Sequence, residues 1–145
     1  MNNIVVDTKK AGTALKPFWR TCVGAGRLNE ALRADFQKHL ETVQRKMPFD
    51  YIRMHGLFHD DMMVYREREG IPVFNWQYVD LVFDHWLSIN IRPFVELGFM
   101  PADLASGPET VFWWKGNITP PRDWDRWELL VGSFVRHCIE RYGLD

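Results

Sequence analysis

Residues 50–61 read DYIRMHGLFHDD, and this stretch decides the expected fold. Ile52 and Met54 alternate with Arg53 and His55. Successive side chains of a β-strand point to opposite faces, so the alternation predicts a strand with an apolar back and a polar front. The back would pack against helices. An arginine and a histidine on the front indicate that this face borders a functional site.

On both sides of this strand, apolar residues recur at spacings of three and four, which predicts helices. The helices are expected over residues 28–47, 75–90 and 123–143. Asn29, Asn75 and Asp123 carry side chains that cap helix starts. Asn90 suits the left-handed conformation in which many helices end, and Gly143 is expected to close the third helix.

Two further strands are expected, over residues 19–24 and 91–97, and a helix follows each strand. This order predicts an α/β fold with parallel strands and right-handed crossovers. Long loops follow the second and third strands, and the first of them should contain a hairpin that turns near Gly70. Because α/β proteins build their sites at the carboxyl ends of parallel strands, both loops are expected to border one.

The chain has 145 residues, which suits one domain, and a net charge of −1, which argues against nucleic acid as partner. No apolar run is long enough to cross a bilayer. The opening residues MNNIVVDTKKAG do not form a secretory signal, so we expect a cytoplasmic protein. Cys22 and Cys138 are expected to be small core residues.

The aromatic content is high, with seven tryptophans and ten phenylalanines. Trp113 and Trp114 lie in a stretch with neither helix nor strand pattern. Exposed aromatic rings stack on sugars and on bases, and the chain has no basic excess that would favour nucleic acid. A carbohydrate ligand is therefore expected.

Other chemistries are disfavoured by the pattern. His55, His59, Asp60 and Asp61 are metal-ligating types, but Gly56 argues against the helix that would bring both histidines to one face. A solvated loop is the simpler interpretation of the last three of these residues.

Two sequence motifs point away from other functions. The GAGR run at residues 24–27 lacks the spacing of a phosphate loop, which argues against a small flavodoxin-like domain. Residues 117–119 fit a glycosylation sequon, which we discount without a signal peptide.

Four runs of the sequence closely resemble the β-xylosidase branch of glycoside hydrolase family 39. They are CVGAGRL, DYIRMHGLFHDD, IRPFVELGFMPADLASG and TVFWWKGNITPP, and the likeness extends from about residue 19 to the end. The resemblance implies that residues 19–145 are the N-terminal three β/α units of a (β/α)8 TIM barrel, truncated before strand four. It implies that residues 1–18 contribute a strand of an accessory β-sandwich.

The resemblance also implies an activity, that of a retaining hydrolase of β-1,4-linked xylosides (a xylan 1,4-β-xylosidase) without a cofactor. By resemblance, Arg53 supports the catalytic nucleophile, His55 bonds sugar hydroxyls and Phe112 forms an apolar wall. Glu96 is our own inference: it should pair with Arg53 on the same face of the adjacent strand, either as part of the site or as a structural ion pair. His55 should be more exposed than Arg53 and border the loop of Phe112.

No catalytic residue is assigned within the chain. In the family, an Asn-Glu-Pro motif carries the acid/base and a second glutamate is the nucleophile, and this chain contains no Asn-Glu-Pro. A retaining glycosidase needs both carboxyl groups, so the chain alone is expected to be inactive. An α-L-iduronidase-like hydrolase and a non-catalytic sugar-binding fragment remain as alternatives.

Overall fold

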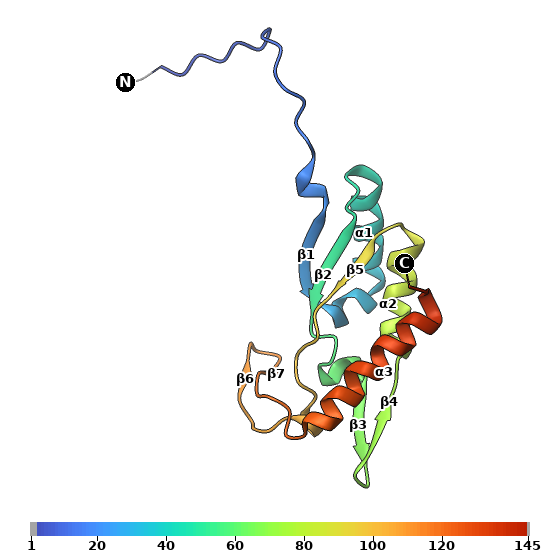
Figure 1. Cartoon of the computed structure of the whole chain (residues 1–145). Helices are drawn as coiled ribbons and strands as arrows, with labels where there is room; N and C mark the ends of the chain where they lie inside the picture. Colours follow the sequence, from blue (N-terminus) through green and yellow to red (C-terminus); the bar gives the residue numbers. More distant parts are fainter. Residues whose placement is uncertain (1–2, 145) are drawn as a thin grey trace.

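A three-stranded parallel sheet in the order β1–β2–β5 organises the computed structural model, which describes residues 3–144 (Figure 1). Its strands are β1 (Cys22–Arg27), β2 (Tyr51–His55) and β5 (Arg92–Val95). The helices are α1 (Ala34–Lys46), α2 (Gln77–Ser88) and α3 (Trp124–Tyr142). Two hairpins, β3 (Tyr65–Arg68) with β4 (Ile71–Phe74) and β6 (Thr110–Val111) with β7 (Gly116–Asn117), lie in the loops after β2 and β5. The predicted parallel α/β arrangement is confirmed.

The start of the chain departs from expectation. The first strand begins at Cys22 and runs through Gly24 to Arg27, whereas residues 18–20 form a 3-10 turn. Cys22 is exposed, which contradicts its predicted place in the core. It lies at the beginning of β1, an edge strand that pairs with β2 on one side and with no strand on the other among residues 3–144.

The first helix also begins later than predicted. Residues 28–32 form a 3-10 turn that buries Leu28 and Ala31, and α1 starts only at Ala34. Asn29 therefore does not cap the helix. Its side-chain amide instead donates a hydrogen bond to the backbone carbonyl of Asp61 at 3.3 Å, which ties this turn to the loop after β2.

Several other boundary predictions are confirmed, although β5 (Arg92–Val95) is shorter than the strand predicted over 91–97. Asp123 caps α3 by accepting hydrogen bonds from two backbone N–H groups at 3.0 and 3.1 Å. Asn75 accepts one from the first residue of α2 at 3.2 Å. Asn90 ends α2 with a φ of 59° in the left-handed region. Gly70, with a φ of 78°, turns the β3–β4 hairpin where it was expected.

The core lies between the apolar back of the sheet and the helices. Ile52 and Met54 are buried there, as the alternation in β2 predicts. Phe58, in the loop after β2, meets Phe134 of α3 edge-on at 5.8 Å between ring centroids. Cys138 packs against this core, and burial raises the pKa of its thiol to about 11.

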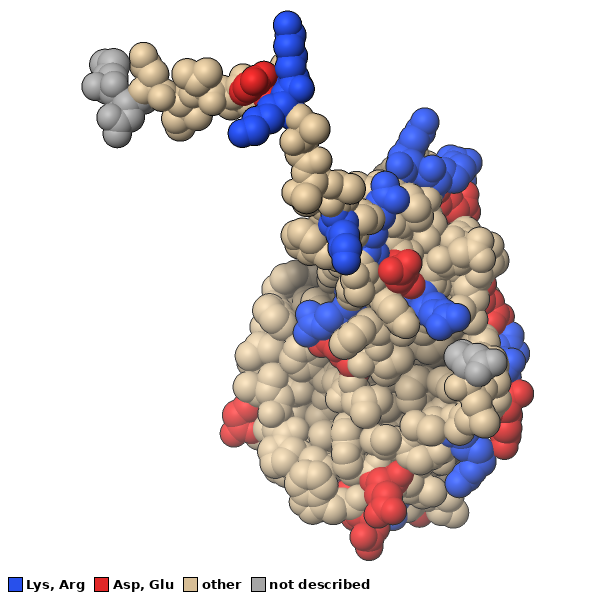
Figure 2. Space-filling model, turned by 45° about the horizontal axis from the view of Figure 1, so that its top comes forward, with Lys and Arg blue, Asp and Glu red and all other residues tan. Residues whose placement is uncertain are grey.

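The edge formed by β5 is open. Val95 and Leu97, at and just after the end of this strand, are 39% and 44% exposed. The strand pairs with β2 on one side and with no strand on the other among residues 3–144. Figure 2 shows a broad uncharged area on one face of the molecule, with Lys, Arg, Asp and Glu gathered around it.

Residues 3–17 contain no helix or strand and extend away from the sheet (Figure 1). Ile4, Val5 and Val6 are exposed there, so they have no pairing strand among the described residues, and the accessory sandwich stays a prediction. None of the helices in residues 3–144 combines the length and apolar character needed to cross a membrane.

Candidate active site

The carboxyl ends of β2 and β5 bring together the predicted polar residues. In the parallel register, Arg53 of β2 lies beside Phe94 of β5, so Glu96 falls just beyond it on the same face. The Nε atom of Arg53 lies 2.8 Å from Oε1 of Glu96, which confirms the expected pair. The arginine side chain is 55% exposed and the glutamate 26%, so the pair borders solvent.

An aromatic cluster surrounds His55. Its ring stacks on Trp114 at 5.6 Å and 18° and on Phe112 at 6.0 Å and 26°, and it meets Phe99 edge-on at 6.0 Å. His55 therefore borders the loop of Phe112, as predicted. It is half-buried and less exposed than Arg53, which contradicts the prediction, because that loop folds back over the ring.

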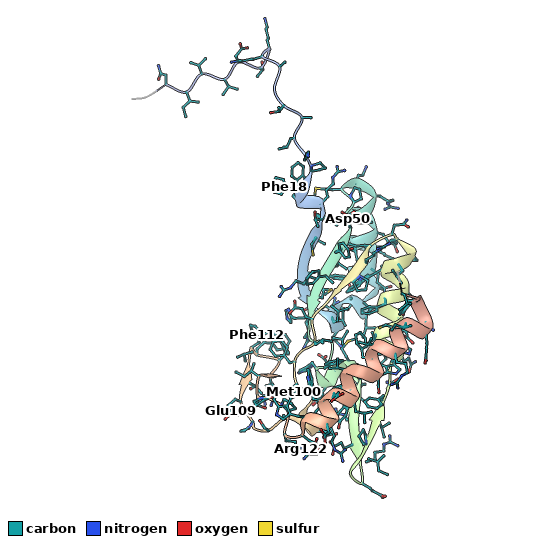
Figure 3. All side chains as sticks on the ribbon, in the orientation of Figure 1. Phe18, Asp50, Met100, Glu109, Phe112 and Arg122 are labelled. Atoms are coloured by element: carbon teal, nitrogen blue, oxygen red, sulfur yellow. The ribbon has the colours of Figure 1, made fainter. Side chains whose placement is uncertain are left out.

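The tip of the β6–β7 hairpin presents the aromatic residues. The backbone N–H of Lys115 donates to the carbonyl of Phe112 at 3.1 Å and closes a tight turn. Both residues have positive φ, 58° and 62°, which is uncommon for residues other than glycine. The turn leaves Phe112 61% and Trp113 85% exposed. Figure 3 shows Phe112 at the side of this hairpin nearest the ends of the sheet strands.

Asn117 and Thr119, the polar residues of the glycosylation sequon, hold the base of this hairpin. The side-chain amide of Asn117 donates to the carbonyl of Gly107 at 2.8 Å. Its Oδ1 atom accepts hydrogen bonds from the backbone N–H and the hydroxyl of Thr119 at 2.9 and 2.7 Å. Both polar side chains therefore fix the loop that carries Phe112.

The loop after β2 combines turn hydrogen bonds with an ion pair, and His59, Asp60 and Asp61 are partly exposed. Nη1 of Arg27 lies 2.9 Å from Oδ2 of Asp61. Nδ1 of His59 accepts a hydrogen bond from the backbone N–H of Asp61 at 3.3 Å. The arginine side chain is only 14% exposed. Asp60 accepts the backbone N–H of Ala102 at 3.1 Å, which links this loop to the next one. Within residues 3–144, no group of His, Cys, Asp and Glu side chains is arranged to hold a metal.

Sequence reasoning did not identify Arg27 or Phe99 as site residues. Arg27 ends the GAGR run, which does not have the spacing of a phosphate loop, and no local sequence pattern distinguishes Phe99. Both lie against Trp114: the Arg27 guanidinium carbon is 5.1 Å from its ring centroid, and the Phe99 ring meets it edge-on at 5.0 Å.

A pocket of about 330 Å³ opens beside the pair and the cluster. Its lining residues are His55, Gly56, Glu96, Leu97, Gly98 and Phe99. This volume falls in the range of small-molecule sites. A carboxylate, an imidazole and an aromatic edge around one opening can hydrogen-bond hydroxyl groups and cover an apolar ring face.

A second polar network lies at the β3–β4 hairpin. Glu67, 10% exposed, accepts a hydrogen bond from the hydroxyl of Tyr65 at 2.8 Å and pairs with Arg122 at 2.6 Å. Burial, and next the bond to Glu67, raise the pKa of Tyr65 to about 12. The network fastens the hairpin to the segment that enters α3.

Comparison with known proteins decides the family. The model of the family described as Glycosyl hydrolases family 39 matches residues 2–145. The chain belongs to glycosyl hydrolase family 39. This confirms the resemblance carried by the four sequence runs.

Two curated relatives of this family 39 chain are both named β-xylosidase. The chain is 51% identical over 134 residues to a β-xylosidase of Geobacillus stearothermophilus, and the match covers 90% of this chain and 27% of the relative. It is 42% identical over 141 residues to a β-xylosidase of Caldicellulosiruptor saccharolyticus, covering 97% and 29%. The chain thus spans less than a third of the length of these relatives.

Solved structures of GH39 enzymes also match most of this chain. A GH39 enzyme from Xanthomonas axonopodis pv. citri matches with a TM-score of 0.84 and 38% identity, over 92% of this chain and 26% of that one. A GH39 β-xylosidase from Caulobacter crescentus matches with a TM-score of 0.84 and 33% identity, over 94% and 30%.

Proposed function

We propose that this chain forms three β/α units of a (β/α)8 barrel in a β-xylosidase, and that it supplies the sugar-binding side of the active site. The observation that carries the proposal is the meeting of Arg53, Glu96 and His55 at the carboxyl ends of adjacent parallel strands, the end at which such barrels bind substrate. The β-xylosidase names of the relatives support xylosides as the substrate class.

Each proposed site residue has a role that fits its surroundings. Glu96 holds the Arg53 guanidinium through Nε, which leaves the other nitrogens able to orient the catalytic carboxylate. His55 offers ring nitrogens to sugar hydroxyls. Phe112, largely exposed beside it, covers the apolar face of a xylose ring.

The catalytic glutamates belong to the remainder of the barrel in this proposal. Residues 1–145 contain no Asn-Glu-Pro sequence, and the Glu96 carboxylate is paired with Arg53. Retaining hydrolysis requires two carboxyl groups about 5 Å apart on either side of the bond. The chain by itself is therefore expected to bind xylosides without cleaving them.

Two measurements on the 145-residue chain test this proposal. With 4-nitrophenyl β-xyloside, no release of nitrophenol above buffer is expected; release that is abolished by Glu96→Gln would place catalysis within the chain. In a titration with xylobiose followed by NMR, shifts are expected at His55 and Phe112.

The titration has a matched control and a competing ligand. Phe112→Ala should weaken xylobiose binding, whereas Phe18→Ala, which removes another exposed phenylalanine outside the site, should not. A preference for an iduronide over xylobiose would favour the iduronidase alternative. Absence of saturable binding by either sugar would refute the proposed function.

A further inference from the structure

We propose that Arg27 is a positioning residue for the sugar-binding site: its guanidinium, fixed by Asp61, holds the indole of Trp114, which in turn sets the orientation of the His55 imidazole. The role of His55 toward a sugar rests on the proposed function. The positioning itself rests on contacts among these four side chains.

The first step is the fixation of Arg27. Its side chain is largely buried at the end of β1, with Nη1 2.9 Å from Oδ2 of Asp61. Asp61 is itself held, because its backbone carbonyl accepts a hydrogen bond from Asn29. The stem of Arg27 passes Gly56 so closely that a Cβ there would lie 3.3 Å from its Cγ. The guanidinium therefore has little freedom to move.

The second step is the fixation of Trp114. The Arg27 guanidinium carbon lies 5.1 Å from the indole centroid, within the range of a cation–π contact. His59 meets the same indole edge-on at 4.9 Å and 90°. On the hairpin side, the indole packs on Gly116: a Cβ at that position would lie 2.5 Å from Cζ3 of the ring.

The third step transfers this position to His55. The imidazole and the indole are nearly parallel, at 18°, with centroids 5.6 Å apart. His55 lies on a strand, so its backbone is fixed and its remaining freedom is rotation of the side chain. Rotation of the imidazole out of this plane would break the stack, so the indole, together with Phe112 on which the ring also stacks, fixes the plane in which both ring nitrogens lie. A hydrogen bond to a sugar hydroxyl depends on the orientation of that plane.

The arrangement requires an arginine rather than any cation. A guanidinium is planar and can stack on an aromatic ring while it donates in its own plane to a carboxylate. A lysine could keep the charge opposite Asp61 but has no planar group to place against the Trp114 ring. Arg27→Lys is therefore expected to behave like Arg27→Gln.

The test uses the full 145-residue chain and the NMR shifts of the His55 ring protons, which the ring current of a stacked indole displaces. In Arg27→Gln and in Arg27→Lys, the displacement should diminish and xylobiose binding should weaken about tenfold, the loss expected from one misdirected hydrogen bond. Gly116→Ala reaches the same indole from the other side and should move the same His55 signals. It decides the question if the Arg27 variants do not fold.

The matched control is Arg33→Gln, which removes an arginine from an exposed pair with Asp35 at 2.8 Å, outside the site. It should leave His55 unchanged. The inference would be overturned if the His55 shifts were unaltered in the folded Arg27 variants or in Gly116→Ala. It would also be overturned if Arg27→Lys had the His55 shifts of the unchanged chain. Altered His55 shifts in a chain that binds no xylobiose would support the positioning and count against the proposed function alone.

Discussion

Replacing Glu96 by glutamine separates a functional ion pair from a structural one. The change removes the negative charge opposite Arg53 and keeps the size of the side chain. More than half of the Arg53 side chain is exposed, and Glu96 is also reached by solvent. Ion pairs in such surroundings contribute about 0–1 kcal/mol to stability, because water screens the charges. The free energy of unfolding should therefore fall by less than about 1 kcal/mol.

Glu67→Gln provides the matched comparison. The Glu67 carboxylate is largely buried, bonds the Tyr65 hydroxyl at 2.8 Å and pairs with Arg122 at 2.6 Å. Arg126 approaches it from α3 at 3.5 Å. Tyr65 is buried, and leaving a buried polar group without its charged acceptor costs about 1–3 kcal/mol, so this variant should lose more stability than Glu96→Gln.

Urea denaturation of both variants, followed by tryptophan fluorescence, measures the two differences under the same conditions. Xylobiose titration gives the functional counterpart, and binding should weaken in Glu96→Gln because Arg53 loses the group that orients it. If Glu96→Gln destabilises the chain as much as Glu67→Gln and leaves sugar binding unchanged, the pair is structural. The assignment of Arg53 and Glu96 to the site would then be wrong.

Three further outcomes are expected. Trp113→Ala should weaken binding of xylotriose more than that of xylose, because the 85% exposed indole beside the site can stack on an additional sugar unit. Trp124→Ala removes an exposed tryptophan at the start of α3 and should affect the binding of neither sugar. Equal effects of the two changes would contradict this prediction. Folding raises the pKa of Tyr65 from 10.0 to about 12, so the contribution of the protonated hydroxyl to stability is complete below pH 10 and is lost as the pH rises toward about 12. The free energy of unfolding, measured across this pH range, should therefore fall, and it should fall less in the Tyr65→Phe variant. At pH 8, a thiol reagent should label exposed Cys22 quickly and Cys138 slowly, because burial holds the pKa of Cys138 at about 11; a fast phase that survives Cys22→Ser would refute this.

The pairing of Arg53 with Glu96 could be derived from the sequence because two local regularities suffice. Side chains alternate along a strand, and neighbouring parallel strands lie at a fixed spacing. Residues at matching heights on the same face must then come together. The register of β2 against β5 and the 2.8 Å contact in the structure confirm this expectation.

The misplaced first helix shows where local rules fail. Asn29 is a good capping residue, yet burial of Leu28 and Ala31 against the core favours a 3-10 turn at that point. The energy of packing exceeds that of one cap, so tertiary structure moved the helix start to Ala34.

The sequence by itself determined the β/α order, most helix ends, the polar front of β2 and the family to which the chain belongs. Only the tertiary structure decided the surroundings of His55. The Arg27 pair with Asp61 and the stack of Trp114 on His55 join residues far apart in the chain. Their contacts depend on how the loops after two strands fold toward each other, and no periodicity within either loop encodes that approach.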